Sequence, residues 1–177
     1  MAKHRVTAAC AALALAGLAM SGCASKKAAD LTCPKVMPAP GADKIVLFRP
    51  GGHDVSDVIY GGTIYGIDVT CDHDNVGVSV NAEIVFFGER VERDMPAVSF
   101  PYFVALLDPQ DNVLDEEAFK VPIDFVAAER YRRAPPEKIT VRLPLKNSAA
   151  ASAYSVLVGF QLTPEQMAIN RLRQKTP

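Results

Sequence analysis

The clearest pattern in the sequence is Val76-Gly77-Val78-Ser79-Val80-Asn81-Ala82-Glu83-Ile84-Val85-Phe86-Phe87. Every second residue from Val76 to Phe86 is apolar, and most residues between them are small or polar. Successive side chains of a β-strand point to opposite faces, so this alternation predicts a half-buried strand. We expect the set that runs from Val76 to Phe86 to face the core.

The segment before this stretch is predicted to be its hairpin partner. Residues 57–70 are rich in β-branched and aromatic residues, which favour strands. Gly61, Gly62 and Gly66 interrupt the segment and indicate bulges or a bend. Residues 72–75, Asp-His-Asp-Asn, have the composition of a polar turn between the two strands.

Further strands are predicted on both sides of this hairpin. The segments with strand signals are residues 44–49, 102–107, 113–121, 139–145 and 154–162. Pro101 has no N–H to donate to a neighbouring strand, so it should be the first residue of its strand. Residues 108–112, Asp-Pro-Gln-Asp-Asn, are typical of a turn, and the strand after them should return antiparallel.

The hydrophobic period changes near the end of the chain. Thr163 is suited to be a helix N-cap, Pro164 to be the first helical residue, and Gln166 to complete a capping box. These residues predict a short helix that ends near Arg173. We expect Ala168 and Leu172 to lie on one face of it.

Together these segments predict an all-β fold. Seven or eight short strands without the spacing of helical crossovers favour an immunoglobulin-like antiparallel β-sandwich with a short C-terminal helix. A small β-barrel is the alternative, because it shares the strand count and the alternation. The sandwich domain would occupy residues 33–163, and the helix and tail would occupy residues 164–177.

The N-terminal segment is typical of an export signal. Lys3, His4 and Arg5 precede an apolar run over residues 6–20, which is 15 residues long. A membrane-spanning helix needs about 20 residues, so a cleaved signal peptide over residues 1–22 fits better. Small residues then come directly before Cys23, in Met20-Ser21-Gly22-Cys23.

Met20-Ser21-Gly22-Cys23 resembles the lipobox of bacterial lipoproteins, although Met20 stands where leucine is usual. The resemblance implies that a dedicated signal peptidase cuts before Cys23, which carries diacylglycerol and an N-acyl chain such as palmitate. Ala24, in place of aspartate, implies the periplasmic face of the outer membrane. The alternative is an export signal cut after Ala24, which would release a soluble periplasmic protein.

Residues 23–32 are predicted to be a flexible tether, polar and alanine-rich with Lys26 and Lys27. Ten residues can span about 35 Å at most, so the domain would stay close to its membrane. Its partners would then be components embedded in, or held against, the same leaflet.

Only Cys33 and Cys71 remain for the folded domain, because Cys10 lies in the signal and Cys23 is the predicted lipid site. In an oxidising compartment, two remaining cysteines predict one disulfide. A redox-active pair or a pair of metal thiolates are the alternatives. The chain has no C-x-x-C spacing, and a metal site would need further ligands.

The charge balance argues against nucleic-acid binding. Residues 1–22 hold two of the 19 basic residues and no acidic residue, so residues 23–177 carry 17 basic and 20 acidic residues. A nucleic-acid binder would instead show a basic stripe.

The sequence contains no recognisable catalytic motif and implies no cofactor, so we expect a protein that is not an enzyme. The residues considered as metal ligands are His53, Asp54, Asp72, His73 and Asp74, which would need to converge from two loops. The Asp72–Asp74 segment also has an ordinary turn composition, so no metal site is predicted.

Arg130-Tyr131-Arg132-Arg133 is the best candidate for partner binding, since arginines beside an aromatic ring can hold carboxylates or phosphates. A solvated loop is the simpler interpretation. Arg171, Arg173 and Lys175 suit a helix C-terminus, and docking onto a partner is the alternative.

Pro101-Tyr102-Phe103-Val104 and Val158-Gly159-Phe160-Gln161-Leu162-Thr163-Pro164-Glu165-Gln166 resemble segments of small proteobacterial lipoproteins, a resemblance that implies no particular activity. We therefore expect a membrane-anchored, periplasm-facing lipoprotein that acts as a non-catalytic interaction or structural module and binds another envelope protein. The alternative is a ligand- or metal-binding periplasmic domain.

Overall fold

A computed structural model describes residues 33–126, 128–145 and 148–175. The strands are β1 (Lys35–Pro38), β2 (Lys44–Phe48), β3 (Val58–Asp74), β4 (Gly77–Arg90), β5 (Ala97–Leu107), β6 (Val113–Asp124), β7 (Tyr131–Arg133), β8 (Glu137–Leu143) and β9 (Ser155–Phe160). Two 3-10 helices, η1 (Val55–Asp57) and η2 (Ser148–Ala153), and one α-helix, α1 (Pro164–Lys175), complete the elements.

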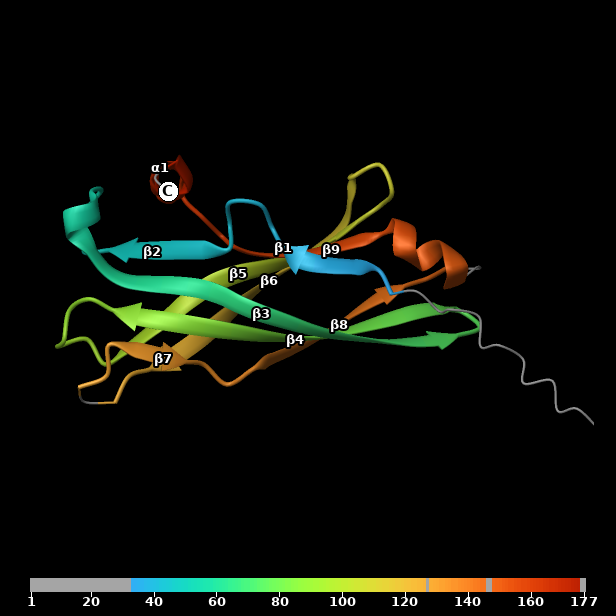
Figure 1. Ribbon diagram of the computed structural model, residues 1–177, viewed down its shortest axis with the longest axis horizontal. Helices are drawn as coiled ribbons and strands as arrows, with labels where there is room; N and C mark the ends of the chain where they lie inside the picture. The colour runs from blue at the N-terminus through green and yellow to red at the C-terminus, as the bar shows by residue number, and fades with distance from the viewer. Residues whose placement is uncertain (1–32, 127, 146–147, 176–177) are drawn as a thin grey trace, which may run out of the picture.

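The strands form two sheets that pack over one core (Figure 1). One sheet has the order β1-β9-β5-β6, and the other has the order β2-β3-β4-β7, with β8 also paired to β4. The predicted all-β fold with a short C-terminal helix is confirmed, and one sheet is curled like half of a barrel. Two details differ: β1 and β7 are additional short strands, and β1 pairs with β9 in parallel.

The long β3–β4 hairpin is the framework of the second sheet. Val78, Val80, Ala82, Ile84 and Phe86 are all buried, as the alternation predicted. Val76 is 70% exposed instead, because the turn is shorter than expected and β4 starts only at Gly77. The predicted irregularity in β3 is present between Ile64 and Gly66.

Gly77 fixes the start of β4 close to the end of β8. Its φ angle is 151°, and a Cβ at this position would collide with the carbonyl oxygen of Leu143. No other residue than glycine fits here without a shift of the backbone.

The core joins the two sheets through aromatic rings. Phe86 of β4 lies 4.9 Å from Tyr102 of β5 and 5.8 Å from Phe160 of β9, measured between ring centroids. Phe100 and Phe160 are also in contact, at 5.9 Å. Offset and tilted ring pairs of this kind stabilise beyond the area they bury.

Pro101 lies inside β5 and does not start it, which corrects the prediction, because β5 begins at Ala97. The Pro101 carbonyl accepts a hydrogen bond from Gln161 N–H at 3.0 Å. Gln161 follows the last residue of β9, so the N–H that proline lacks falls where this ladder ends. A proline is tolerated at such a position.

Helix α1 begins with the predicted capping box. Gln166 N–H donates to Thr163 Oγ1 at 3.3 Å, and Thr163 N–H donates to Gln166 Oε1 at 2.7 Å. Ala168 and Leu172, four residues apart in the helix, lie on an exposed face: Ala168 is exposed and Leu172 is 63% exposed. Gln166, Ile169 and Asn170 are buried instead, against β2.

Candidate interaction site

The two sheets leave one pair of strand edges facing each other without joining. Strand β6 is the edge of the first sheet and pairs only with β5. Strands β7 and β8 pair only with β4. Within the described residues, no hydrogen bond links β6 to β7 or β8. We call this gap, between residues 113–124 and 131–143, the seam.

The register of β6 shows which of its backbone groups face the seam. Phe125 N–H donates to the Pro96 carbonyl at 2.7 Å, just beyond the β5–β6 ladder. Because hydrogen-bonded pairs alternate in an antiparallel ladder, odd-numbered residues from 115 onward turn their backbone groups to β5. Even-numbered residues, including Ala118 and Pro122, turn theirs to the seam. Pro122 therefore occupies a position where no ladder N–H is needed.

The backbone groups of β8 alternate in the same way. Ala134 N–H donates to the Phe86 carbonyl at 2.9 Å, so even-numbered residues of β4 face β7 and β8. Ala82 pairs with Ile139 and Val80 with Val141. The backbone groups of Lys138, Thr140 and Arg142 consequently face the seam, where no strand in the described part of the chain pairs with them.

A groove of about 430 Å³ occupies the half of the seam between β6 and β8. Its lining includes apolar side chains from both sheets, namely Val104, Leu106, Phe119, Ile139 and Val141. The carboxylates of Asp115 and Glu117 line it from β6. A groove with apolar and convergent polar groups is typical of a binding site.

The acidic side of this groove is not neutralised. On β8, Arg142 donates to Asp74 at 2.7 Å and to Ser79 Oγ at 2.6 Å, and Lys138 lies 3.7 Å from Glu83. The hydrogen bond from Arg142 lowers the pKa of Asp74. Asp115 and Glu117 have no ion-pair partner among the described residues. The groove therefore presents net negative charge.

Tyr102 is buried beneath the seam, with an exposed fraction of 0%. Its ring stacks on Phe119 at a centroid distance of 5.2 Å. Its hydroxyl oxygen has no hydrogen-bond partner in good geometry. Burial raises the pKa of Tyr102, and the nearby carboxylates of Glu137 and Glu117 raise it further. The hydroxyl thus lies between the charged groups of β6 and β8.

A second hollow, of about 190 Å³, continues the seam between β6 and β7. Pro122, Ile123 and Asp124 line one side, and residues 132–135 and Glu137 line the other. Arg132 and Arg133 belong to this hollow together with the carboxylates of Asp124 and Glu137, so this end of the seam carries charges of both signs.

The predicted binding segment, residues 130–133, is paired mainly with neighbouring carboxylates of this chain. Arg130 Nη2 and Tyr131 Oη both contact Glu89 Oε1, at 2.8 and 3.2 Å. The hydrogen bond with Glu89 raises the pKa of Arg130. Arg132 Nη1 pairs with Glu129 at 2.9 Å, which lowers the pKa of Glu129.

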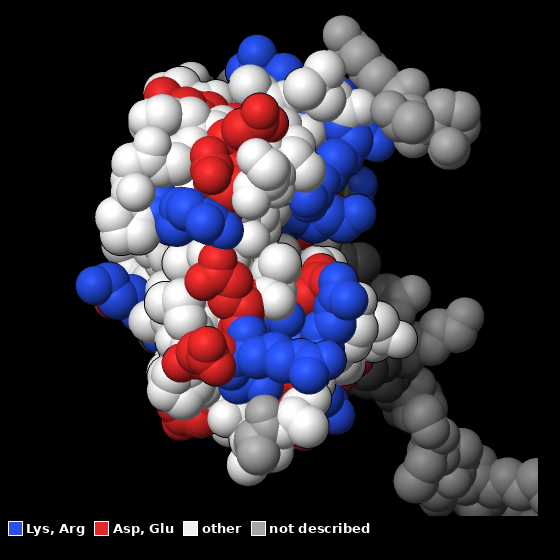
Figure 2. All heavy atoms as spheres, turned by 90° about the vertical axis from the view of Figure 1, so that its left-hand side faces the viewer, with Lys and Arg blue, Asp and Glu red and all other residues white. Residues whose placement is uncertain are grey.

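Of this segment, Arg133 has no ion-pair partner among the residues that the structure describes, and it is exposed. Figure 2 shows this end of the molecule, where patches of basic and acidic side chains lie side by side among uncharged residues. The segment is thus a partly neutralised charged surface, of which Arg133 remains available to a partner.

The residues considered as metal ligands do not come together. His53 precedes η1, whereas residues 72–74 end the 17-residue strand β3. At about 3.3 Å per residue, the length of β3 that separates the two groups is up to roughly 50 Å. Asp54 caps η1 through Val55 N–H at 2.6 Å. In the described part of the chain, no group of three or more histidine, cysteine or carboxylate residues could hold a metal.

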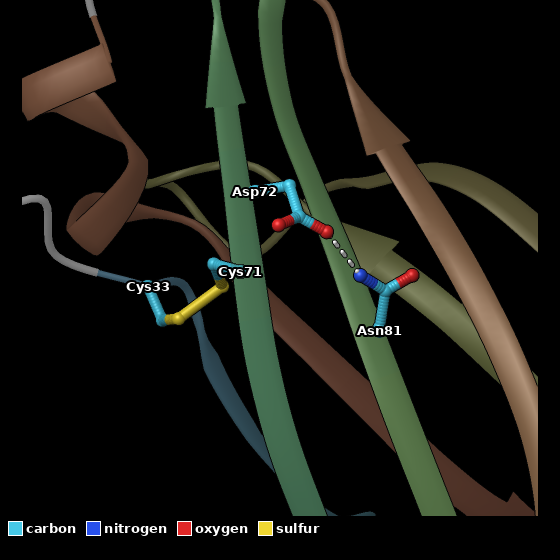
Figure 3. The surroundings of a disulfide bond; sticks show 4 residues. All are labelled: Cys33, Cys71, Asp72 and Asn81. Atoms are coloured by element: carbon cyan, nitrogen blue, oxygen red, sulfur yellow. Dashed lines mark hydrogen bonds between the residues drawn. A yellow bond between two sulfur atoms is a disulfide. The ribbon is translucent and has the colours of Figure 1, made fainter.

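The predicted disulfide joins Cys33 to Cys71, with Cα atoms 5.8 Å apart (Figure 3). It ties the segment before β1 to β3. Beside it, Asp72 accepts a hydrogen bond from Asn81 Nδ2 at 2.8 Å. The ring nitrogens of His73 are buried without a partner.

Cys23, the signal peptide and the tether lie outside the described residues, as does the side chain of Lys175, so these remain predictions. The described residues include no helix with the length and apolar character needed to cross a bilayer. No protein-family model matches the chain, and neither a curated protein nor a solved structure is significantly similar to it.

Proposed function

We propose that this protein is a lipid-anchored lipoprotein of the bacterial envelope, whose folded domain is a non-catalytic module that binds another envelope protein. The observation that carries the proposal is the seam, where two unpaired strand edges flank a charged groove. Unpaired edges are ready templates for pairing with another chain. Neither histidine of the folded domain lines the groove, and its charged groups are suited to recognition.

Export is supported by the disulfide between Cys33 and Cys71, since structural disulfides persist mainly in oxidising compartments. The lipobox-like Met20-Ser21-Gly22-Cys23 supplies the anchor. Several acyl chains on Cys23 would hold the protein stably, whereas a single chain binds only marginally. Ala24 favours the periplasmic face of the outer membrane, and a soluble periplasmic protein is the alternative.

The anchor is tested by metabolic labelling with radioactive palmitate, comparing the native chain with Cys23→Ser. We expect label in the native chain only, and we expect the native protein to sediment with outer membranes. A native chain that carries no label and is recovered from the soluble periplasm would overturn the lipid anchor in favour of the soluble alternative.

The interaction is tested by crosslinking in cells, followed by mass spectrometry of the co-purified proteins. We expect one partner at an amount close to that of the native protein, and much less of it with Cys23→Ser. Ala24→Asp is a matched control that keeps the lipid and is expected to move the protein to the inner membrane. Recovery of nothing above background from any form would overturn the interaction proposal.

A further inference from the structure

We infer that the seam binds an extended segment of a partner polypeptide, which adds to β8 as a strand and points every second side chain, a lysine or arginine, into the groove. This inference rests on the proposed function and specifies the partner's chemistry. It is carried by the backbone of β8, the apolar lining of the groove and the carboxylates of β6.

The lining of the groove shows which edge receives the segment. Five consecutive residues of β8, 138–142, line it. Consecutive residues share a lining only when the backbone edge itself faces the space, because side chains alternate across a strand. From β6, only Asp115, Glu117 and Phe119 contribute, which is every second residue and therefore one side-chain face.

A strand added to β8 would find its hydrogen-bonding partners in place. The N–H and C=O groups of Lys138, Thr140 and Arg142 face outward, and main-chain bonds to such an edge supply affinity in β-augmentation. Pockets for alternate side chains supply specificity. Here the inward side chains of the added strand would meet Val104, Leu106 and Phe119.

The charges specify the occupant. Asp115 and Glu117 have no ion-pair partner among the described residues, whereas Arg142 is hydrogen-bonded to Asp74 and Lys138 lies 3.7 Å from Glu83. A lysine or arginine of the partner can bury its methylene groups on the apolar lining and place its charge on these carboxylates. An acidic segment would instead meet like charge.

A second copy of this chain fits the seam poorly. If two β8 strands paired antiparallel about Thr140, Lys138 of one copy would lie opposite Arg142 of the other. Like charges directly opposite each other destabilise an antiparallel pair. The edge of β8 is thus better suited to a different polypeptide.

The inference is tested with the purified, lipidated full chain in detergent micelles and fluorescein-labelled peptides. The probe is the octapeptide (Val-Lys)4, and its charge-reversed counterpart is (Val-Glu)4. We expect saturable binding of the basic peptide by fluorescence anisotropy and no binding of the acidic one. Failure of the basic peptide to bind would overturn the inference.

Neighbouring carboxylates of β6 provide matched variants. Glu117→Lys reverses a charge inside the groove, whereas Glu116→Lys makes the same change on the opposite side-chain face of the strand. We expect Glu117→Lys to weaken peptide binding about tenfold or more, as like-charge contacts do. Glu116→Lys should change it less than about twofold. Equal effects of both variants would overturn the assignment to the seam.

The role of the β8 edge is tested with Thr140→Pro, which removes an outward N–H without removing a bond to β4. We expect the variant to lose peptide binding while its far-ultraviolet circular dichroism spectrum stays the same as that of the native protein. If this variant misfolds, hydrogen exchange of the native protein is measured instead. The peptide should then protect the Lys138 and Thr140 amides from exchange. Amides that gain no protection from the peptide would overturn β-augmentation. If spermidine binds saturably and displaces the peptide, the groove is a small-cation site and the inference is overturned.

The same variants separate this inference from the proposed function when introduced into cells. A crosslinked partner that persists equally with Glu117→Lys and Glu116→Lys would leave the interaction module standing and overturn the seam as its site. Peptide binding in vitro without any crosslinked partner would overturn the proposed envelope function and leave the groove's specificity standing.

Discussion

The two long sides of this sandwich are closed in opposite ways. On one side, α1 continues from β9 of the first sheet and lies beside β2 of the second (Figure 1). Gln166 Nε2 donates to the Val46 carbonyl at 2.6 Å, and Asn170 Nδ2 donates to the Lys44 carbonyl at 2.7 Å. On the other side, the seam has no hydrogen bond between the sheets among the described residues.

This difference separates stability from recognition. The helix side satisfies backbone carbonyls of β2 with buried amides, which fixes the two sheets together. The strand edges at the seam carry charged residues and Pro122. Such residues keep an exposed edge from pairing with other chains indiscriminately. Substitutions on the helix side should therefore affect unfolding, and substitutions in the seam should affect binding.

The largest expected effect comes from the disulfide. Cys71→Ala opens a loop with a sequence separation of 38 residues, and the chain-entropy model predicts a loss of about 4 kcal/mol in the free energy of unfolding. Urea denaturation checks this. Native protein kept in reductant is the control and should match the variant. A variant as stable as the oxidised native protein would show that the tie between β1 and β3 is dispensable.

The next effect tests the docking of α1. Ile169 is 7% exposed and packs with Val46 and Val58. Ile169→Ala should lower the free energy of unfolding by roughly 2–4 kcal/mol, because it removes buried methyl groups and leaves a cavity. Met167→Ala, at a residue that is 38% exposed, is the matched control, with an expected change below about 1 kcal/mol. Similar losses in both variants would contradict the observed buried face.

A pH dependence follows from the raised pKa of Tyr102. Above about pH 10, the unfolded chain loses this proton while the folded protein keeps it, so the folded state binds more protons and stability falls as pH rises. Tyr102 should lower the free energy of unfolding by up to about 1.4 kcal/mol per pH unit, until its hydroxyl also ionises in the folded protein.

Denaturation of the native protein and Tyr102→Phe between pH 9 and 11.5 measures this slope. The variant should retain the dependence that comes from other groups, including Tyr60, whose pKa burial also raises. Identical slopes for the two proteins would show that the Tyr102 hydroxyl is not held in its neutral form.

The two buried tyrosines also predict opposite effects at neutral pH. Tyr60 Oη–H contacts the carbonyls of Ala97 and Met95 at 2.8 and 3.0 Å. Tyr60→Phe should cost about 1 kcal/mol, since it leaves carbonyl acceptors without this donor. Tyr102→Phe removes a hydroxyl that lies beside the Glu137 carboxylate without a hydrogen bond in good geometry, so stability should stay the same or rise. A larger loss for Tyr102→Phe would mean that its hydroxyl is bonded in solution.

The sequence predicted the parts of the fold that depend on local patterns. The alternation over residues 76–87 identified the long hairpin, and Thr163 with Gln166 identified the start of α1, because both signals arise between near neighbours. The cysteine count and the export signal predicted the disulfide. Strands β1 and β7 were missed because residues 35–38 and 131–133 are too short to show a period.

The candidate site was harder to predict because it depends on pairing across the whole chain. Residues 113–117 carry two apolar and three acidic residues without alternation, and only the register reveals that Asp115 and Glu117 face the groove. Pro122 was the available signal that β6 is an edge. An apolar period could not predict the buried face of α1, because polar Gln166 and Asn170 are buried there and donate to carbonyls of β2.

The smallest expected effect is the stability of the seam variants. Asp115→Lys and Glu117→Lys replace exposed carboxylates that have no ion-pair partner among the described residues, so each should change the free energy of unfolding by no more than about 0.5 kcal/mol. Thermal unfolding followed by circular dichroism measures this. A loss above about 1.5 kcal/mol would show that these carboxylates hold the sheets together. Near-native stability, combined with weakened peptide binding, would instead assign them to recognition, because a structural charge cannot be reversed without cost to the fold.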